Sequence, residues 1–184
     1  EIPPVRFVES QHLKALPYPS REGKIEDIDK LLNVENVQDR NMILCWAFNA
    51  LFPTGPYPIL MLTGQQGSAK TTTTKLVRSL VDPAKPLARS LPSDDRNLMV
   101  SATNNWILSY DNLSKISDKM SDSLCRIATG AGMGIRANYT DKEEIVFDAA
   151  LPVILNGIEN SATRLDLLDR SIVISLPTMT QQQR

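Results

Sequence analysis

Residues 64–71 read Gly-Gln-Gln-Gly-Ser-Ala-Lys-Thr and lie between two segments of different character. The preceding residues 58–63 are nearly all apolar, as in a buried parallel strand, and residues 71–81 are expected to form a helix that ends at Asp82-Pro83. A glycine-rich turn there lets backbone N–H groups converge on a phosphate, and the helix N-terminus adds partial positive charge. The order strand, loop, helix therefore predicts a phosphate-binding loop in an α/β fold.

The side chains of this loop predict a site for ATP and Mg²⁺. Lys70 is placed to reach the β- and γ-phosphates, and the Thr71 hydroxyl to ligate Mg²⁺. Alanine stands at position 69, where glycine usually precedes the lysine; it is tolerated if the backbone there has helical φ, since only positive φ demands glycine. The alternative is a Gly/Ser turn that merely precedes Lys-Thr. The predicted nucleotide-binding residues are Gly64, Gln65, Gln66, Gly67, Ser68, Ala69, Lys70, Thr71 and Thr72.

The rest of the chain alternates strand-like and helix-like segments. Further strands are expected at residues 87–91, 106–110, 151–155 and 171–176, and helices at 95–103, 117–128 and 163–170. This alternation predicts a P-loop NTPase sandwich of three layers, with a five-stranded, mostly parallel sheet covered on both faces.

Four segments are expected along the chain. Residues 1–23 contain four prolines and predict an extended arm or linker. Residues 24–56 predict a helical segment, 57–177 the ATPase core and 178–184 a polar tail. The start at a residue other than Met suggests a piece of a longer protein.

Two strand ends carry polar residues that suit ATP hydrolysis. Asp111 ends the strand 106–110, and in P-loop ATPases such an acid holds Mg²⁺ through water. Asn112 follows; it is able to orient water but not to take its proton, so slow or partner-dependent turnover is expected. Asn156 ends the strand 151–155 and is a candidate for holding the attacking water. Each residue also has a plainer interpretation as the end of a strand.

Residues 135–147 predict a β-hairpin with a turn at 140–142. Arg136 and Lys142 supply positive charge and Tyr139 an aromatic face, so the hairpin is a candidate contact for single-stranded DNA. Glu143 and Glu144 favour the alternative, a solvated hairpin of mixed charge.

Arg170 is expected at the C-terminal end of the helix 163–170. A cation there complements the helix dipole. The functional alternative is an arginine that enters the γ-phosphate site of a neighbouring subunit. Arg164 is the second candidate for that role.

The composition limits the remaining classes of function. The net charge is −1, so any DNA contact must come from a local cluster or a ring of subunits. Cys45 and Cys125 have no metal or redox spacing and are expected to be reduced core residues in the cytoplasm. His12 is expected at the surface. No apolar run approaches the ~20 residues that span a bilayer.

These motifs together resemble the AAA+ ATPase domains of superfamily 3 helicases and primase–helicases of phages and mobile elements. The similar stretches are 64–71, 110–114, 121–126, 130–142, 152–157 and 167–170. The resemblance implies a hexameric ring that moves along DNA, often joined to a primase domain, with Asn156 at the sensor position. Many AAA+ ATPases carry a glutamate where this chain has Asn112.

Three functions follow from the sequence. The first is a DNA helicase motor. The second is a nucleotide-controlled assembly switch or loader that barely hydrolyses ATP, which Asn112 favours and the hairpin disfavours. The third is a small-molecule kinase, which lacks support because neither an acceptor pocket nor an arginine-rich lid is evident.

Overall fold

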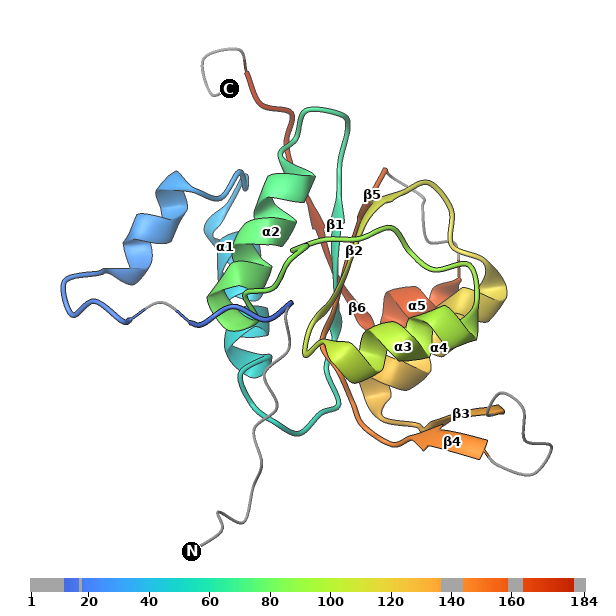
Figure 1. Cartoon of the computed structure of the whole chain (residues 1–184). Coiled ribbons are helices and arrows are strands. Elements are labelled where there is room, and N and C mark those ends of the chain that lie inside the picture. Colours follow the sequence, from blue (N-terminus) through green and yellow to red (C-terminus); the bar gives the residue numbers. More distant parts are fainter. Residues whose placement is uncertain (1–11, 17, 137–143, 159–163, 181–184) are drawn as a thin grey trace, which may run out of the picture.

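A four-stranded parallel sheet forms the centre of the molecule (Figure 1). The computed structural model describes residues 12–16, 18–136, 144–158 and 164–180. The strand order is β2-β5-β1-β6, so that the strand before the phosphate loop is central. Leu60 of β1 pairs with Ile154 on one side and with Ile172 on the other. The strands are β1 (Ile59–Thr63), β2 (Leu108–Leu113), β5 (Val153–Gly157) and β6 (Ser171–Ser175).

Helices cover both faces of this sheet, as the sequence predicts. Helices α1 (Val37–Asn49) and α2 (Lys70–Val81) lie on one face, and α3 (Asp95–Asn104), α4 (Asp118–Thr129) and α5 (Leu165–Asp169) on the other. Alternate side chains of β1 enter the two cores: Ile59 and Met61 pack with α3 and α4, and Leu60 and Leu62 with α1 and α2. Burial on both faces explains why β1 is apolar at successive positions.

Side-chain caps fix where the helices begin. The Asp94 carboxylate accepts a hydrogen bond from Asn97 N and begins α3, and the Ser117 hydroxyl accepts one from Met120 N and begins α4. Short polar side chains suit this role, because they satisfy the free N–H groups of a first turn. Gly130, at φ +75°, then ends α4 in the left-handed region.

The expected strand at residues 87–91 is wrong. In the described part of the chain this segment makes a single parallel bridge, between Arg89 and Tyr110. Arg89 N donates to Ser109 O at 3.0 Å, and Asp111 N donates to Arg89 O at 2.8 Å. Pro86 and Pro92 enclose the segment and have no N–H to extend a ladder, so the described sheet has four strands and not five.

The N-terminal segments contact the core. The short 3₁₀ helix η1 (Ile25–Lys30) and α1 form the expected helical segment, and Ile43 and Trp46 of α1 are buried against the sheet. The described part of the arm is extended: Leu13 forms an antiparallel bridge with Ala84. The four-segment division of the chain stays a prediction.

A two-stranded antiparallel hairpin stands apart from the main sheet, at the edge opposite the phosphate loop (Figure 1). It consists of β3 (Met133–Arg136) and β4 (Glu144–Phe147), and Arg136 pairs with Glu144. The expected hairpin is therefore confirmed in its strands. Tyr139, Lys142 and the turn lie outside the described residues.

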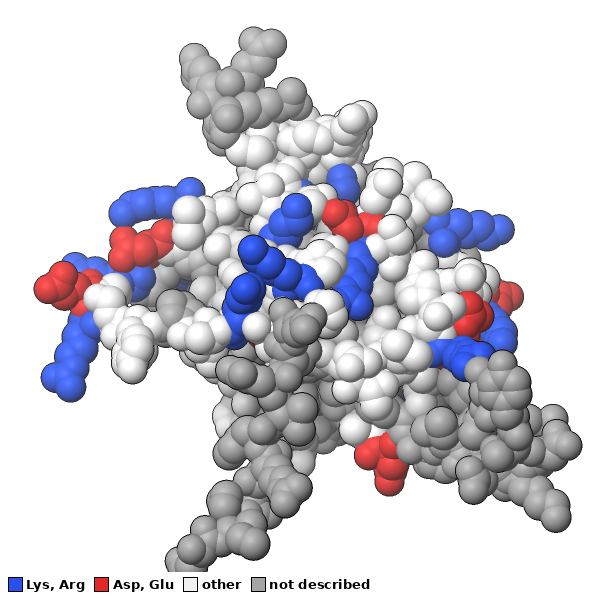
Figure 2. Space-filling model, viewed as in Figure 1, with Lys and Arg blue, Asp and Glu red and all other residues white. Residues whose placement is uncertain are grey.

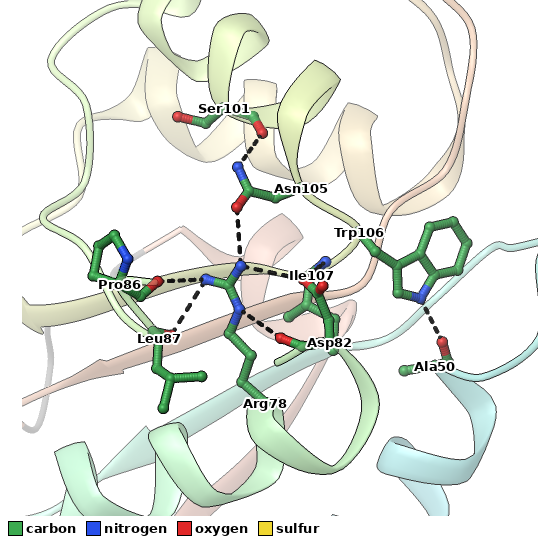
Figure 3. Close-up of polar contacts among 9 residues, drawn as sticks. All are labelled: Ala50, Arg78, Asp82, Pro86, Leu87, Ser101, Asn105, Trp106 and Ile107. Carbon is green, nitrogen blue, oxygen red and sulfur yellow. Dashed lines mark hydrogen bonds and ion pairs between the residues drawn. The ribbon is translucent and has the colours of Figure 1, made fainter. Parts of the chain in front are cut away.

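A buried ion pair ties α2 to the beginning of β2 (Figure 3). The side chain of Arg78 is 1% exposed and donates to the Asp82 carboxylate at 3.1 Å and to Asn105 Oδ1 at 2.9 Å. The same carboxylate accepts from Ile107 N at 3.0 Å. Burial lowers the pKa of Arg78, and the charge of Asp82 opposes that shift. This cluster fixes the helix after the phosphate loop relative to the strand that carries Asp111.

The two cysteines differ in environment. Cys125 is buried on α4, and burial raises its pKa to about 11, which keeps the thiol protonated. Cys45 is exposed on α1, so the expectation that both are core residues is wrong for Cys45. His12 is exposed, as expected. Over the described residues, every helix is too short or too polar to cross a membrane.

Candidate functional site

The loop between β1 and α2 adopts a backbone that needs positive φ at several positions. Gly64 has φ +142° and Gly67 has φ +84°. A Cβ on Gly64 would lie 2.6 Å from the carbonyl oxygen of Leu176, so no larger residue fits without displacing β6. These two glycines are therefore required by geometry and not only by the motif.

Ala69 is in the left-handed region, at φ +62°. The condition under which alanine is tolerated here without strain, a helical φ, is therefore not met. A Cβ in this region clashes with the following carbonyl and costs roughly 1–2 kcal/mol. Glycine at this position would avoid that cost, so the alanine introduces strain into the turn that leads to Lys70.

Lys70 is the first residue of α2 and turns back over the loop. Its ammonium donates to the carbonyl oxygens of Gly64 and Gln65, both at 2.7 Å, and to Ser68 Oγ at 3.3 Å. Desolvation lowers the pKa of Lys70, and the carboxylate of Asp111 opposes that shift. The ammonium is therefore held at the mouth of the loop, where phosphate oxygens would replace carbonyl oxygens as its acceptors.

Thr71 and Asp111 meet across the site, although 40 residues separate them in sequence. The Thr71 hydroxyl donates to Asp111 Oδ1 at 3.0 Å. A hydroxyl and a carboxylate are oxygen ligands that suit Mg²⁺, which normally takes one or two carboxylates together with water and substrate phosphates. No cluster of three or more His, Cys, Asp or Glu that could hold a metal occurs among the described residues. The residues present therefore fit a metal that arrives with a nucleotide.

Asn156 holds two elements of the site together. Its side chain is buried, with Oδ1 accepting from Asn112 N at 3.1 Å and Nδ2 donating to Thr74 Oγ1 at 2.7 Å. Asn112 itself is at φ +60°, at an irregularity of β2 between Tyr110 and Leu113. Asparagine tolerates the left-handed region better than most residues, which gives a local reason for Asn at this position.

A cavity of about 560 Å³ contains these residues. It is lined by Gln66, Gly67, Ser68, Ala69, Lys70, Thr71, Thr72, Asp111, Asn112, Asn156, Gly157 and Ile158. Asp111 is the one carboxylate among them. Within this lining, no second acid is placed to take a proton from water.

A second cavity, of about 670 Å³, lies on the other side of the loop. Gly67, Ala69 and Thr72 line both cavities, and residues 29–33 and Met179 close the second one. Asn33 Nδ2 donates to Ser68 O at 3.1 Å and to Pro177 O at 2.6 Å, and Met179 N donates to Gly67 O at 3.1 Å. Sequence reasoning missed Asn33 and Met179, because no local pattern marks contacts across such long separations.

Arg170 lies at the opposite edge of the sheet. Its carbonyl accepts from Ile59 N, at the start of β1, whereas the phosphate loop follows the end of that strand. Strands rise about 3.3 Å per residue, so five residues of β1 separate Arg170 from the loop. Its guanidinium is 42% exposed and paired with Asp166. Arg164 is 41% exposed and pairs with Asp122 at 3.0 Å.

The structure thus brings together one group of the predicted site residues and separates the others from it. Lys70, Thr71, Asp111, Asn112 and Asn156 surround one cavity. Arg170 and the hairpin strands lie at the far edge of the sheet, outside that cavity.

Comparisons with known proteins match this chain to one family and to several solved structures. The family model of the actinomycete integrative conjugative element replication protein matches residues 25–183. Among solved structures, the JCV helicase is 11% identical with a TM-score of 0.46, and NtrX from Brucella abortus in complex with ADP is 13% identical with a TM-score of 0.48. The aligned parts cover 77% and 83% of this chain, but only 46% and 38% of those chains. A search of curated protein sequences gives no match.

Proposed function

Because this chain belongs to the family of actinomycete integrative conjugative element replication proteins, we propose that it is the ATP-hydrolysing motor of a ring-forming DNA helicase. In this proposal the fold is of the AAA+ type, the core spans residues 57–177 and the ring is a hexamer that acts on single-stranded DNA. A primase domain would belong to the full-length protein.

The contact between Thr71 Oγ1 and Asp111 Oδ1, at 3.0 Å, carries this proposal. Two residues chosen independently from sequence, one from the loop motif and one from a strand end, share a hydrogen bond in one cavity. If residues 64–71 were only a Gly/Ser turn that precedes Lys-Thr, the contact between Thr71 and Asp111 would not be expected. Their oxygens are the ligands expected beside the phosphates of a nucleotide.

Each residue then has a task in phosphoryl transfer. The loop N–H groups and Lys70 bind the β- and γ-phosphates, and Thr71 and Asp111 hold the metal. Mg²⁺ held there would neutralise charge that develops on the phosphate oxygens. Asn156 and Asn112 orient water at the γ-phosphate. Because the reaction depends mainly on positioning and electrostatics, hydrolysis without a carboxylate base is slow but feasible.

The second cavity suits the base and ribose of the nucleotide. It shares Gly67, Ala69 and Thr72 with the phosphate cavity, so a nucleotide whose phosphates lie on the loop would extend across the loop into it. Asn33 and Met179 help to hold this second cavity in place, since both donate to loop carbonyls.

In the proposed ring, Arg170 acts on the nucleotide of a neighbouring subunit. Five residues of β1 lie between it and its own phosphate loop, so an action on phosphate requires the loop of a neighbour. The hairpin residues Arg136, Tyr139 and Lys142 would then face DNA, where six copies add weak contacts together.

The test measures ATP binding, and ATP hydrolysis with and without single-stranded DNA, over a series of protein concentrations. Lys70→Ala should lose tight ATP binding, because it removes the charge on the β- and γ-phosphates. Asp111→Asn should keep the fold and lose Mg²⁺-dependent hydrolysis. If Lys70→Ala binds ATP like the parent, or if Asp111→Asn hydrolyses ATP at the parent rate, the assignment of the site is wrong.

A second candidate is an assembly switch that binds ATP with little hydrolysis. The observation in its favour is the absence of a second carboxylate in the described lining of the phosphate cavity, together with Asn112 in the left-handed region. The same assay separates the two: DNA-stimulated turnover supports the motor, and nucleotide-dependent assembly without turnover supports the switch.

A further inference from the structure

A cluster of lysines lies beside α2, away from the phosphate loop. Lys14, Lys75 and Lys85 line a cavity of about 420 Å³, and all three are exposed. Figure 2 shows Lys and Arg side chains gathered over α2 and the segment after it, in the centre of this face. The remaining residues of the lining carry no charge: they are Ser79, Pro83, Ala84, Pro86, Leu87 and Ala88.

Three separate segments bring the lysines together. Lys75 comes from α2, Lys85 from the segment after α2, and Lys14 from the N-terminal arm. Two backbone hydrogen bonds fasten the arm to that segment: Lys14 N donates to Pro83 O and Lys85 N to His12 O, both at 2.8 Å.

The buried Arg78 holds the floor of this cavity from below. Its Nη1 donates to the carbonyl oxygens of Leu87 at 3.3 Å and Pro86 at 3.5 Å (Figure 3). The segment that carries Lys85 is therefore anchored to the core as well as to the arm. Backbone hydrogen bonds and the Arg78 side chain therefore fix the positions of the segments that form the lysine-lined cavity.

Gathering three ammonium groups without a carboxylate in the lining is unfavourable in isolation, because like charges repel. A polyanion removes that repulsion. Ammonium groups act as point charges on phosphate, and the uncharged floor offers an apolar surface to the sugars between phosphates. Since the family consists of replication proteins, DNA is the polyanion that this surface meets.

We propose that the lysine-lined cavity of Lys14, Lys75 and Lys85 binds the sugar–phosphate backbone of DNA, separately from the hairpin. Figure 1 shows the hairpin and α2 well apart on the molecule. The chain therefore has two DNA contacts: the hairpin of the proposed motor and this cavity, which holds DNA on another face.

The experiment compares two double variants with equal changes of net charge. Lys75→Gln with Lys85→Gln removes two lysines of the cavity, and Lys24→Gln with Lys119→Gln removes two exposed lysines elsewhere. Fluorescence anisotropy with labelled single-stranded and duplex oligonucleotides, at several NaCl concentrations, gives the dependence of log K on log[salt]. A poly-glutamate probe is measured in parallel, and DNA-free ATPase activity and thermal melting serve as checks of folding.

In the cavity variant, the magnitude of the salt slope should fall by about 1.8 for duplex DNA, or about 1.4 for single strands, because each phosphate contact contributes about 0.9 or 0.7. The oligonucleotide that shows the fall identifies the form of DNA bound. The control variant should keep the parent slope. Unchanged slopes on both oligonucleotides, or loss of poly-glutamate binding alone, would overturn the proposal. Because DNA binding is read without ATP turnover, failure of the proposed motor function is detected separately.

Discussion

The two ends of the strands in the main sheet differ in the hydrogen-bond partners and the solvent exposure of their polar residues. At the end with the phosphate loop, Lys70 binds carbonyl oxygens of its own loop, Thr71 binds Asp111 and Asn156 binds Thr74, and all three are largely shielded from water. At the opposite end, Arg170 pairs with Asp166 on α5, and at the N-terminus of α5 Arg164 pairs with Asp122 on α4; both arginines remain about two-fifths exposed. At the end with the phosphate loop, the polar contacts are made within one chain. The charged side chains of Arg164 and Arg170 lie instead at the surface, where they are accessible to a second subunit.

The largest expected effect tests whether the exposed edge completes the site of a neighbour. Arg170→Ala should bind ATP nearly normally and hydrolyse it about 10³-fold or more slowly, the scale of trans arginines in other phosphoryl-transfer systems. Lys70→Ala keeps the arginine and loses its own site. Mixed rings of the two variants contain some intact interfaces, so part of the activity should return in a steady-state ATPase assay.

The control for that mixing experiment is co-assembly, shown by size-exclusion chromatography of differently tagged subunits. If two inactive variants co-assemble and recover nothing, the trans role of Arg170 is wrong. Its contact with Asp166 at the end of α5 then serves the helix alone, as the dipole argument allows.

A smaller effect separates buried from exposed ion pairs. Arg78→Met should lower the free energy of unfolding by about 3–5 kcal/mol, because it leaves the Asp82 carboxylate buried without its cation. Arg164→Met, which removes an exposed ion pair, should change it by about 1 kcal/mol or less. Urea denaturation followed by circular dichroism measures both. Equal decreases in the free energy of unfolding for the two variants would contradict the expectation that the buried pair contributes more to stability than the exposed one.

The smallest effect concerns the strain at Ala69. Ala69→Gly relieves roughly 1–2 kcal/mol of left-handed strain but adds about 0.4–1 kcal/mol of entropy to the unfolded chain. We expect a net stabilisation between about 0 and about 1.6 kcal/mol in the same denaturation assay. Ala102→Gly, in the interior of α3, should instead destabilise by about 1 kcal/mol. Destabilisation by Ala69→Gly would contradict a strained alanine.

The sequence predicted the elements whose signals are local. The loop motif and the apolar run of β1 each lie within a few residues, and both correspond to the observed strand, loop and helix. The meeting of Thr71 and Asp111 was also predictable, because parallel strands end at the same edge of a sheet.

The failures come from properties that neighbouring residues do not determine. The alternation of strand-like and helix-like segments suggested a strand at 87–91, but the flanking prolines limit it to one bridge. The φ angle of Ala69 is a single dihedral angle, and the residue type alone does not determine it. Cys45 is exposed because α1 is apolar on more than the face that meets the sheet. Asn33 and Met179 reach the loop only through the tertiary fold.

The hydrogen bonds from Asn33 and Met179 to the phosphate loop have a mechanical consequence. Asn33 lies upstream of the sheet and Met179 downstream of it, and both hold carbonyls of the same short turn. A pull on either segment therefore acts directly on the residues that would hold phosphate, without passing through the core. If a nucleotide shifts the loop when it binds, the same two hydrogen bonds would pass that shift to the segments before and after the sheet.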